Sequence, residues 1–229
     1  MKRYAMPLIV LPFLGQPLSA QGAPKYELVV SAGLHIPVNP IGPAAQASPA
    51  WYLDLERVDP ALALSASARV NWSKSVATRF ALQWVVPSRA EGMFRCRPGT
   101  ACPDVLLPTS ADVSVQTAML DIIVTPLHVH PSVRPYVALG GGIRRDHYEW
   151  RNAAVLVEGG EHSTSSMAFR AGLGVDVAVF GSALRLEIED LRRPSGAFIY
   201  DSPSGDLPSP RPRGQHDIGL TLGWRLLSF

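Results

Sequence analysis

Apolar and polar residues alternate with a period of two along eight stretches of the chain, which is the pattern of strands with two different faces. In residues 26–36, Tyr26 and Leu28 fall on one face, whereas Glu27 and His35 fall on the other. The eight stretches are residues 26–36, 62–72, 79–86, 113–125, 134–148, 167–177, 184–189 and 216–229. No apolar run of about 18 residues follows residue 20, so the pattern predicts strands and excludes a membrane-spanning helix.

The connections between these stretches differ in length in a regular way. Roughly twenty or more residues rich in Pro, Gly and Ser separate stretches one and two, three and four, and seven and eight. A similar polar segment, residues 152–164, separates five and six, whereas residues 73–75 and 180–182 are short turns and residues 126–131 are intermediate. Long extracellular loops and short periplasmic turns are typical of a transmembrane β-barrel. A soluble barrel, the alternative, has no reason to sort its loops by end.

The polar face of the predicted strands carries acids and arginines interleaved with Ser, Gly and Ala. A soluble barrel would expose this face to water, whereas a membrane barrel would enclose it, because lipid surrounds its apolar face. Eight strands leave an interior that side chains just fill, which favours a lumen plugged by paired charges. The predicted lumen charge network is Glu27, Arg69, Arg79, Arg170, Asp176, Arg185, Glu187 and Glu189, with Asp121, Arg144, Asp217 and Arg225 on the same face.

The first residues predict export from the cytoplasm. A basic start, Met1–Arg3, precedes an apolar stretch at residues 5–14, which is the order found in a secretory signal peptide. Cleavage is expected after Ala20, with cleavage after Gly22 as the alternative. The predicted organisation is therefore a signal peptide, residues 1–20, followed by one barrel domain, residues 21–229.

Composition and cysteine content agree with an exported protein. Charged residues make up 17% of the 229 residues and the net charge is +2, so no strongly basic surface points to nucleic acid. Cys96 and Cys102 bracket a short, turn-rich loop that a disulfide can close in an oxidising compartment. No second cysteine pair or nearby histidine pair completes a zinc site, so we predict a disulfide and no metal.

With its leader, its eight alternating strands, the segment Arg134–Gly142 and the terminal Phe229, the chain resembles the small outer-membrane β-barrel proteins of Gram-negative bacteria. The OmpA-like and OmpX-like barrels are the nearest type. The resemblance implies an all-β, eight-stranded, antiparallel, up-and-down transmembrane barrel in the outer membrane, in contact with outer-membrane lipid and lipopolysaccharide. It also implies that Phe229 is an assembly signal for the barrel-assembly machinery.

Candidate chemistry is sparse. Some related barrels modify lipid A, and the best candidate for a deacylase-like triad is His162 and Ser163 with Glu187 or Glu189. A polar loop and an interior ion pair explain the same residues without catalysis. A second pair, His128 and His130, has the spacing of two metal ligands on one side of an extended segment, but its setting in a Pro-flanked turn favours simple exposure. Residues 140–142 are three glycines that are not followed by the helix of a phosphate loop, and they favour room for side chains or a bend.

The sequence therefore predicts a monomeric outer-membrane barrel with a structural or surface-interaction role and no cofactor or catalytic residue. A lipid-modifying enzyme and a small diffusion pore are the alternatives. The ligand of the extracellular loops is not identified by the sequence.

Overall fold

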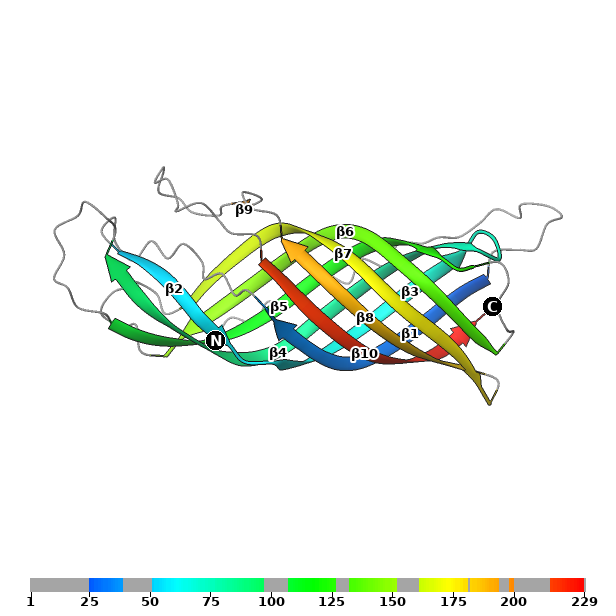
Figure 1. Ribbon diagram of the computed structural model, residues 1–229, viewed down its shortest axis with the longest axis horizontal. Coiled ribbons are helices and arrows are strands. Elements are labelled where there is room, and N and C mark those ends of the chain that lie inside the picture. The colour runs from blue at the N-terminus through cyan, green and yellow to red at the C-terminus, as the bar shows by residue number, and fades with distance from the viewer. Residues whose placement is uncertain are drawn as a thin grey trace.

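Eight strands close into an antiparallel barrel (Figure 1). The structure, a computed structural model, describes residues 25–38, 51–96, 107–126, 132–151, 161–180, 182–193, 198–199 and 215–228. The barrel strands are β1 (Lys25–Pro37), β3 (Ala61–Asn71), β4 (Val76–Cys96), β5 (Leu107–Val124), β6 (Val133–Trp150), β7 (Glu161–Val179), β8 (Ser182–Arg193) and β10 (Gln215–Ser228). Each pairs with its neighbours in chain order, and β1 pairs with β10, so the ring has no open edge. The predicted all-β, eight-stranded, antiparallel barrel is confirmed.

Each predicted alternating stretch lies within one barrel strand or extends slightly past its end, since the period-two pattern reflects two different surroundings. On β7 the outward positions from Met167 to Val177 are all apolar. Ten residue steps at ~3.3 Å span ~33 Å, and a strand tilt of ~40° reduces this to ~25 Å, the height of the apolar band on a membrane barrel. None of the described residues belongs to a helix long and apolar enough to cross a bilayer.

One connection differs from the sequence prediction. Residues 87–112 were expected to form a long loop, but β4 and β5 continue as paired strands to Cys96 and from Leu107, so only residues 97–106 lie between them. Pro87 does not end β4, because it lies within a register shift between Val85 and Ser88, where a ladder hydrogen bond is not required.

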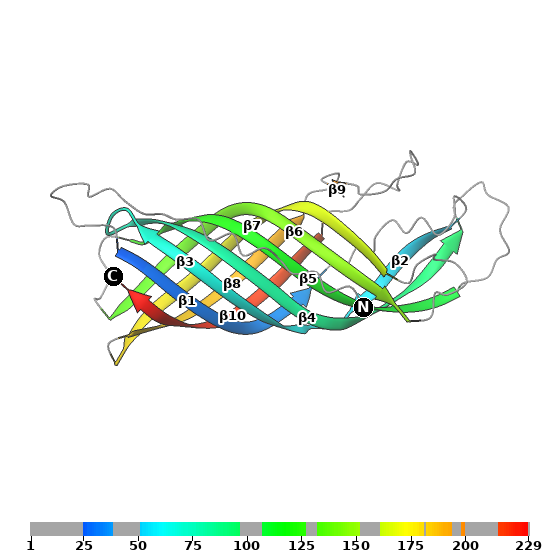
Figure 2. The same cartoon turned by 180° about the vertical axis from the view of Figure 1, so that it is seen from behind.

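A small sheet projects from the long-loop end of the barrel. The short strand β2 (Trp51–Val58) pairs with the C-terminal part of β4, residues 90–96, and this part of β4 pairs with β5 on its other side. Figures 1 and 2 show these three strands extending well beyond the remaining barrel strands. A two-residue strand, β9 (Phe198–Ile199), pairs with β7 near the same end. Neither β2 nor β9 was predicted, because both lie within stretches rich in turn-forming residues.

Two predicted turns are short, as expected. At the β3–β4 turn, Ser73 Oγ accepts hydrogen bonds from the backbone N–H of Ser75 at 3.2 Å and of Val76 at 3.0 Å. At the β7–β8 turn, Phe180 adopts a positive φ of 46° and is fully exposed.

Several sequence predictions lie outside the described residues or side chains: the signal peptide, the Cys96–Cys102 disulfide, His128, His130, the side chain of His162, and Phe229.

Candidate functional site

The polarity of the barrel is inverted relative to a soluble protein. On β5, Leu120 and Ile122 are each 59% exposed, whereas Asp121 between them is 0% exposed. On β8, Leu186 is 47% exposed and Glu187 is 6% exposed. Apolar side chains therefore face outward and charged side chains face the lumen, which is the arrangement of a membrane β-barrel.

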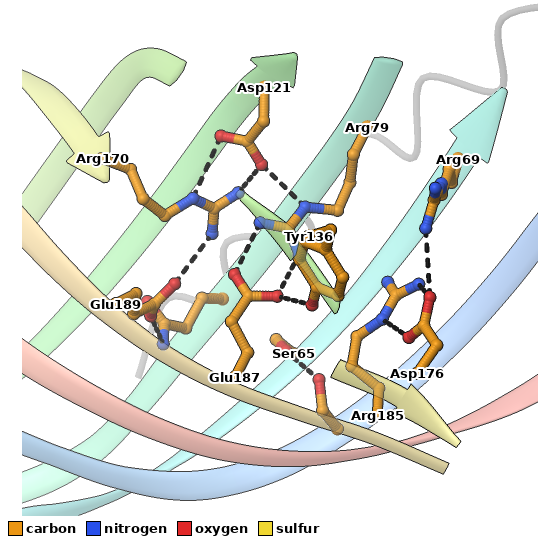
Figure 3. Close-up of polar contacts among 12 residues, drawn as sticks. Ser65, Arg69, Arg79, Asp121, Tyr136, Arg170, Asp176, Arg185, Glu187 and Glu189 are labelled. Atoms are coloured by element: carbon orange, nitrogen blue, oxygen red, sulfur yellow. Dashed lines mark hydrogen bonds and ion pairs between the residues drawn. The ribbon is translucent and has the colours of Figure 1, made fainter. Parts of the chain in front are cut away.

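A central cluster of five charged residues crosses the lumen (Figure 3). Arg79 donates from Nε to Asp121 Oδ2 at 2.7 Å and from its terminal nitrogens to both oxygens of Glu187. Arg170 donates from Nε to Asp121 Oδ1 at 3.0 Å and from Nη1 to Glu189 Oε2 at 3.2 Å. These residues come from β4, β5, β7 and β8, so the cluster ties opposite walls of the barrel together.

A second cluster lies toward the short-turn end. Arg185 donates to Asp176 from Nε at 2.7 Å and from Nη2 at 3.1 Å, and Arg69 donates to the same carboxylate at 3.1 Å. Glu27 lies 3.8 Å from Arg185 and 3.6 Å from Arg225. Two arginines thus share one aspartate, and Glu27 adds a second negative charge beside them.

A third cluster lies toward the long-loop end. Arg144 donates to Asp146 at 2.7 Å and also to Asp217. Arg193 donates to Asp146 Oδ2 at 2.7 Å, and His35 Nε2 lies 3.3 Å from Asp217 Oδ2. Both aspartates are 0% exposed, so their charges are balanced by side chains rather than by water.

Tyr136 connects the central cluster with the one at the short-turn end. Its hydroxyl donates a hydrogen bond to Glu187, and its ring centroid lies 5.9 Å from the Arg69 guanidinium carbon and 5.3 Å from that of Arg185. Opposite Tyr136 in the β6–β7 ladder is Gly174, where a Cβ would overlap the tyrosine ring. A large ring therefore fits because its cross-strand partner has no side chain.

All eight residues of the predicted network face the lumen, and each lies within salt-bridge distance of another charged residue. Asp121, Arg144, Asp217 and Arg225 join them. Sequence reasoning did not assign Asp146, Arg193 and Tyr136 to the network. The alternation itself carried the signal for Asp146, since it lies two residues from Arg144 on the same face.

The interior leaves little room for water between these side chains. A cavity of ≈ 20 Å³ remains beside Arg79, Arg170 and Glu187, and one of ≈ 10 Å³ remains near His35 and Arg144. Spaces of this size hold about one water molecule. Gly140 supplies part of the room that the charges need, because a Cβ there would overlap the Asp121 carboxylate.

The deacylase-like triad considered from the sequence does not assemble. Glu187 and Glu189 lie in the lumen on Arg79 and Arg170, whereas Ser163 lies on the outward side of β7. Ser163 Oγ instead lies 2.8 Å from Nδ1 of His147, its cross-strand partner on β6. Among the described side chains, no carboxylate contacts His147.

No protein-family model matches the chain, and no curated protein matches it. Solved structures do. Neisserial surface protein A (NspA) is 13% identical with a TM-score of 0.48, over 88% of this chain and 95% of that protein. The outer membrane protein OprG of Pseudomonas aeruginosa is 13% identical with a TM-score of 0.48, over 91% and 99% of the two chains. Ail, the attachment invasion locus protein of Yersinia pestis, solved with the heparin analogue sucrose octasulfate, is 8% identical with a TM-score of 0.46, over 90% and 100%.

The closed eight-stranded barrel with an apolar outer face agrees with the resemblance to outer-membrane barrels that the sequence predicted. The low identities of the similar structures and their TM-scores below 0.5 carry no conclusion about what this chain binds or does.

Proposed function

We propose that this chain is an outer-membrane β-barrel protein with a closed lumen and a structural or surface-interaction role. The loop pattern supports an orientation with the long connections outside the cell and the short turns in the periplasm. In this orientation, the projecting sheet of β2, β4 and β5 stands above the membrane surface. This sheet is the observation that carries the surface-interaction role.

The edge of β2 suggests how the projecting sheet binds. One edge of β2 pairs with β4, and within the described part of the chain no strand pairs with the other edge. A free strand edge presents unpaired backbone N–H and C=O groups, to which an extended peptide can add as a further strand. The proposed ligand is therefore an extended polypeptide segment of another protein.

A binding measurement with a defined peptide tests this role. The probe is a fluorescein-labelled peptide of alternating valine and threonine, and its anisotropy is measured with the purified barrel in detergent micelles. The comparison variant replaces residues 51–58 and 89–112 by short Gly- and Asn-containing connections; it keeps residues 76–88 of β4, residues 113–124 of β5 and the other six barrel strands. The intact barrel should bind the peptide and the shortened one should not. Equal binding by both would refute the proposal.

A matched control peptide and a protease experiment sharpen this test. Methylating alternate backbone nitrogens of the peptide removes its ladder hydrogen bonds without changing its side chains, so this peptide should not bind. Trypsin added to intact cells should cut near Arg89 to Arg97 or Arg211 to Arg213, which the loop pattern of the sequence predicts to lie outside the cell. Cleavage confined to Lys74 would mean that the orientation is inverted.

The lumen clusters support a plugged barrel rather than a diffusion pore. Described arginines from six of the eight barrel strands hold carboxylates in the interior, and the cavities between them hold about one water each. An ion would have to displace these pairs in order to pass. We therefore propose that the network stabilises the barrel and closes it.

The contact between His147 and Ser163 favours a second candidate function, a lipid hydrolase. A serine hydroxyl 2.8 Å from an imidazole nitrogen is within reach for nucleophile activation. A Ser163→Ala variant distinguishes the candidates through the mass profile of lipid A from cells that express it. If lipid A has the same mass profile in cells with the natural protein, in cells with the variant and in cells with neither protein, the hydrolase function is excluded.

The remaining features of the proposal concern biogenesis. Export by the signal peptide at residues 1–20, the Cys96–Cys102 disulfide and recognition of Phe229 by the barrel-assembly machinery remain predictions from the sequence. We also propose that the barrel is a monomer, since its sheet is closed and offers no barrel strand edge to a second copy.

A further inference from the structure

The outer face of the barrel changes from apolar to polar at the same cross-strand row on three adjacent strands. Gln116 on β5, Arg145 on β6 and Ser165 on β7 are direct partners in the two ladders. On the short-turn side of this row, the next outward residues are Ala118, Ile143 and Met167. A lipid bilayer has the same boundary where acyl chains meet headgroups, and this row therefore marks that depth on the protein.

A groove of ≈ 680 Å³ lies on the outer face beside this row. Its apolar lining comes from β3, β4, β5 and β6, and its polar lining residues are Ser65, Gln83, Gln116, Thr117, Arg145 and Ser165, of which Gln116, Arg145 and Ser165 are on the outward side of their strands. The apolar lining residues are Leu64, Ala66, Leu82, Trp84, Ala118 and Ile143. A groove with an apolar lining and a cation at its polar side fits an amphiphile with an anionic head.

Arg145 is exposed, and no described carboxylate lies within salt-bridge distance of it. Other outward-facing arginines differ: Arg89 pairs with Glu91 at 3.0 Å, and Arg192 pairs with Asp190 at 2.7 Å. The nearest acid on its own strand face, Glu149, is four residues away, which is ~13 Å along a strand. The guanidinium is therefore available to an external anion.

The neighbours of Arg145 favour a phosphate as that anion. A guanidinium donates two parallel hydrogen bonds to phosphate oxygens, and a phosphate has further oxygens that accept from neighbouring donors. The Gln116 amide and the Ser165 hydroxyl flank Arg145 on its two sides. An uncharged lipid would offer the guanidinium no anionic partner.

We propose that this groove binds a phosphorylated glycolipid of the outer leaflet, with Arg145 on a phosphate and the acyl chains on the apolar lining. The choice of the outer leaflet rests on the proposed function, because it requires the long-loop end to face outside. The binding itself concerns a lateral surface of the barrel and is independent of the projecting sheet. A lipid site on the wall would fix the depth of the barrel in the membrane at this row.

Native mass spectrometry of the purified, folded full-length barrel in detergent micelles tests the proposal. The probes are bisphosphorylated lipid A, the same lipid with both phosphates removed, and phosphatidylglycerol with acyl chains of matched length. The natural protein should retain one lipid A per barrel, and removing the phosphates should raise the dissociation constant about tenfold. Equal retention of lipid A and its dephosphorylated form would overturn the role of the phosphate. Equal retention of lipid A and phosphatidylglycerol would overturn the choice of a glycolipid.

Two pairs of variants locate the site. Arg145→Gln should weaken lipid A binding as much as removing the phosphates does, whereas Arg192→Gln should not, because Arg192 is already held by Asp190. Ala118→Trp should fill the groove and lower lipid retention, whereas Ala171→Trp, also outward but outside the groove lining, should not. Equal effects within either pair would overturn the assignment of the groove.

Electrophoretic mobility with and without heating confirms that each variant is folded before it is measured. Because binding is measured in micelles, its failure does not affect the placement of the protein in the cell. Conversely, an inverted orientation in the protease experiment would leave lipid binding intact and change only the leaflet.

Discussion

Replacing Glu187 by glutamine is the most direct perturbation of the lumen. Glu187 is 6% exposed and accepts hydrogen bonds from two nitrogens of Arg79 and from the hydroxyl of Tyr136. An amide oxygen in the position of Oε2 keeps the bonds from Arg79 Nη1 and Tyr136, but the NH₂ group in the position of Oε1 faces Arg79 Nη2 and cannot accept. Removing the negative charge from a buried ion pair and leaving one guanidinium nitrogen without its acceptor predicts that Glu187→Gln lowers the free energy of unfolding by about 3–5 kcal/mol.

Glu91 provides a matched control for the same chemical change. It also pairs with an arginine, Arg89, at 3.0 Å, but the two side chains are 52% and 59% exposed. Water and salt screen such a pair, so Glu91→Gln should change the free energy of unfolding by less than about 1 kcal/mol. The two variants thus differ in the burial of the pair and not in the substitution.

Equilibrium unfolding in urea, followed by tryptophan fluorescence with the barrel in lipid vesicles, measures both changes under one condition. A clear difference between the two variants is the expected result. If Glu187→Gln lowered stability no more than Glu91→Gln, the lumen would be hydrated and the charge network would not be a plug. The measured loss is the effect of leaving Arg79 partly unpaired and does not equal the net contribution of the pair to folding.

Four further predictions concern the two faces of the wall and the lumen. Leu186→Arg should lower the free energy of unfolding in vesicles by about 2–4 kcal/mol, because the side chain faces acyl chains. A nitroxide label at Leu186 should collide with lipid-soluble oxygen and one at Glu187 should not, and equal oxygen accessibility would contradict the assignment of the faces. Gly140→Ala should destabilise the barrel by about 1–3 kcal/mol, because its Cβ meets the Asp121 carboxylate. In the control Gly141→Ala the added Cβ lies 3.7 Å from its nearest neighbouring atom. If both variants lowered the free energy of unfolding equally, the lumen side chains would be able to adjust to the Cβ at residue 140. The pure protein should give conductance near background in planar bilayers, and steady, large channels would show that the clusters do not block ions.

The sequence alone determined the strands and their faces. A side chain in a strand faces the side opposite to its neighbours, so a wall with lipid outside and charges inside imposes a period of two on the residues. This is why Leu186 and Glu187 could be assigned to opposite faces without a structure. Connection lengths are also local, and they separated the two ends of the barrel, although charged and proline-containing residues at 87–112 concealed the extension of β4 and β5.

The tertiary structure decided which charges meet. Arg79 and Glu187 are 108 residues apart, and their contact depends on the diameter of the barrel and on the registers of all the strands between them. Alternation specifies that both face inward but contains no information on height or on the distance across the lumen. The same holds for Tyr136, whose ring fits because Gly174 lies opposite it in the ladder.

On the outer face too, the sequence determines which residues face outward, and the tertiary structure decides which of them lie together. Alternation places Arg144 inside and Arg145 outside, but only the registers of β5, β6 and β7 bring Gln116, Arg145 and Ser165 into one row. The groove beside them is formed by residues of four strands and is invisible in any one of them. Local periodicity therefore sets what each residue faces, and the closure of the sheet sets which residues act together, because only closure fixes the distances between strands that are far apart in the sequence.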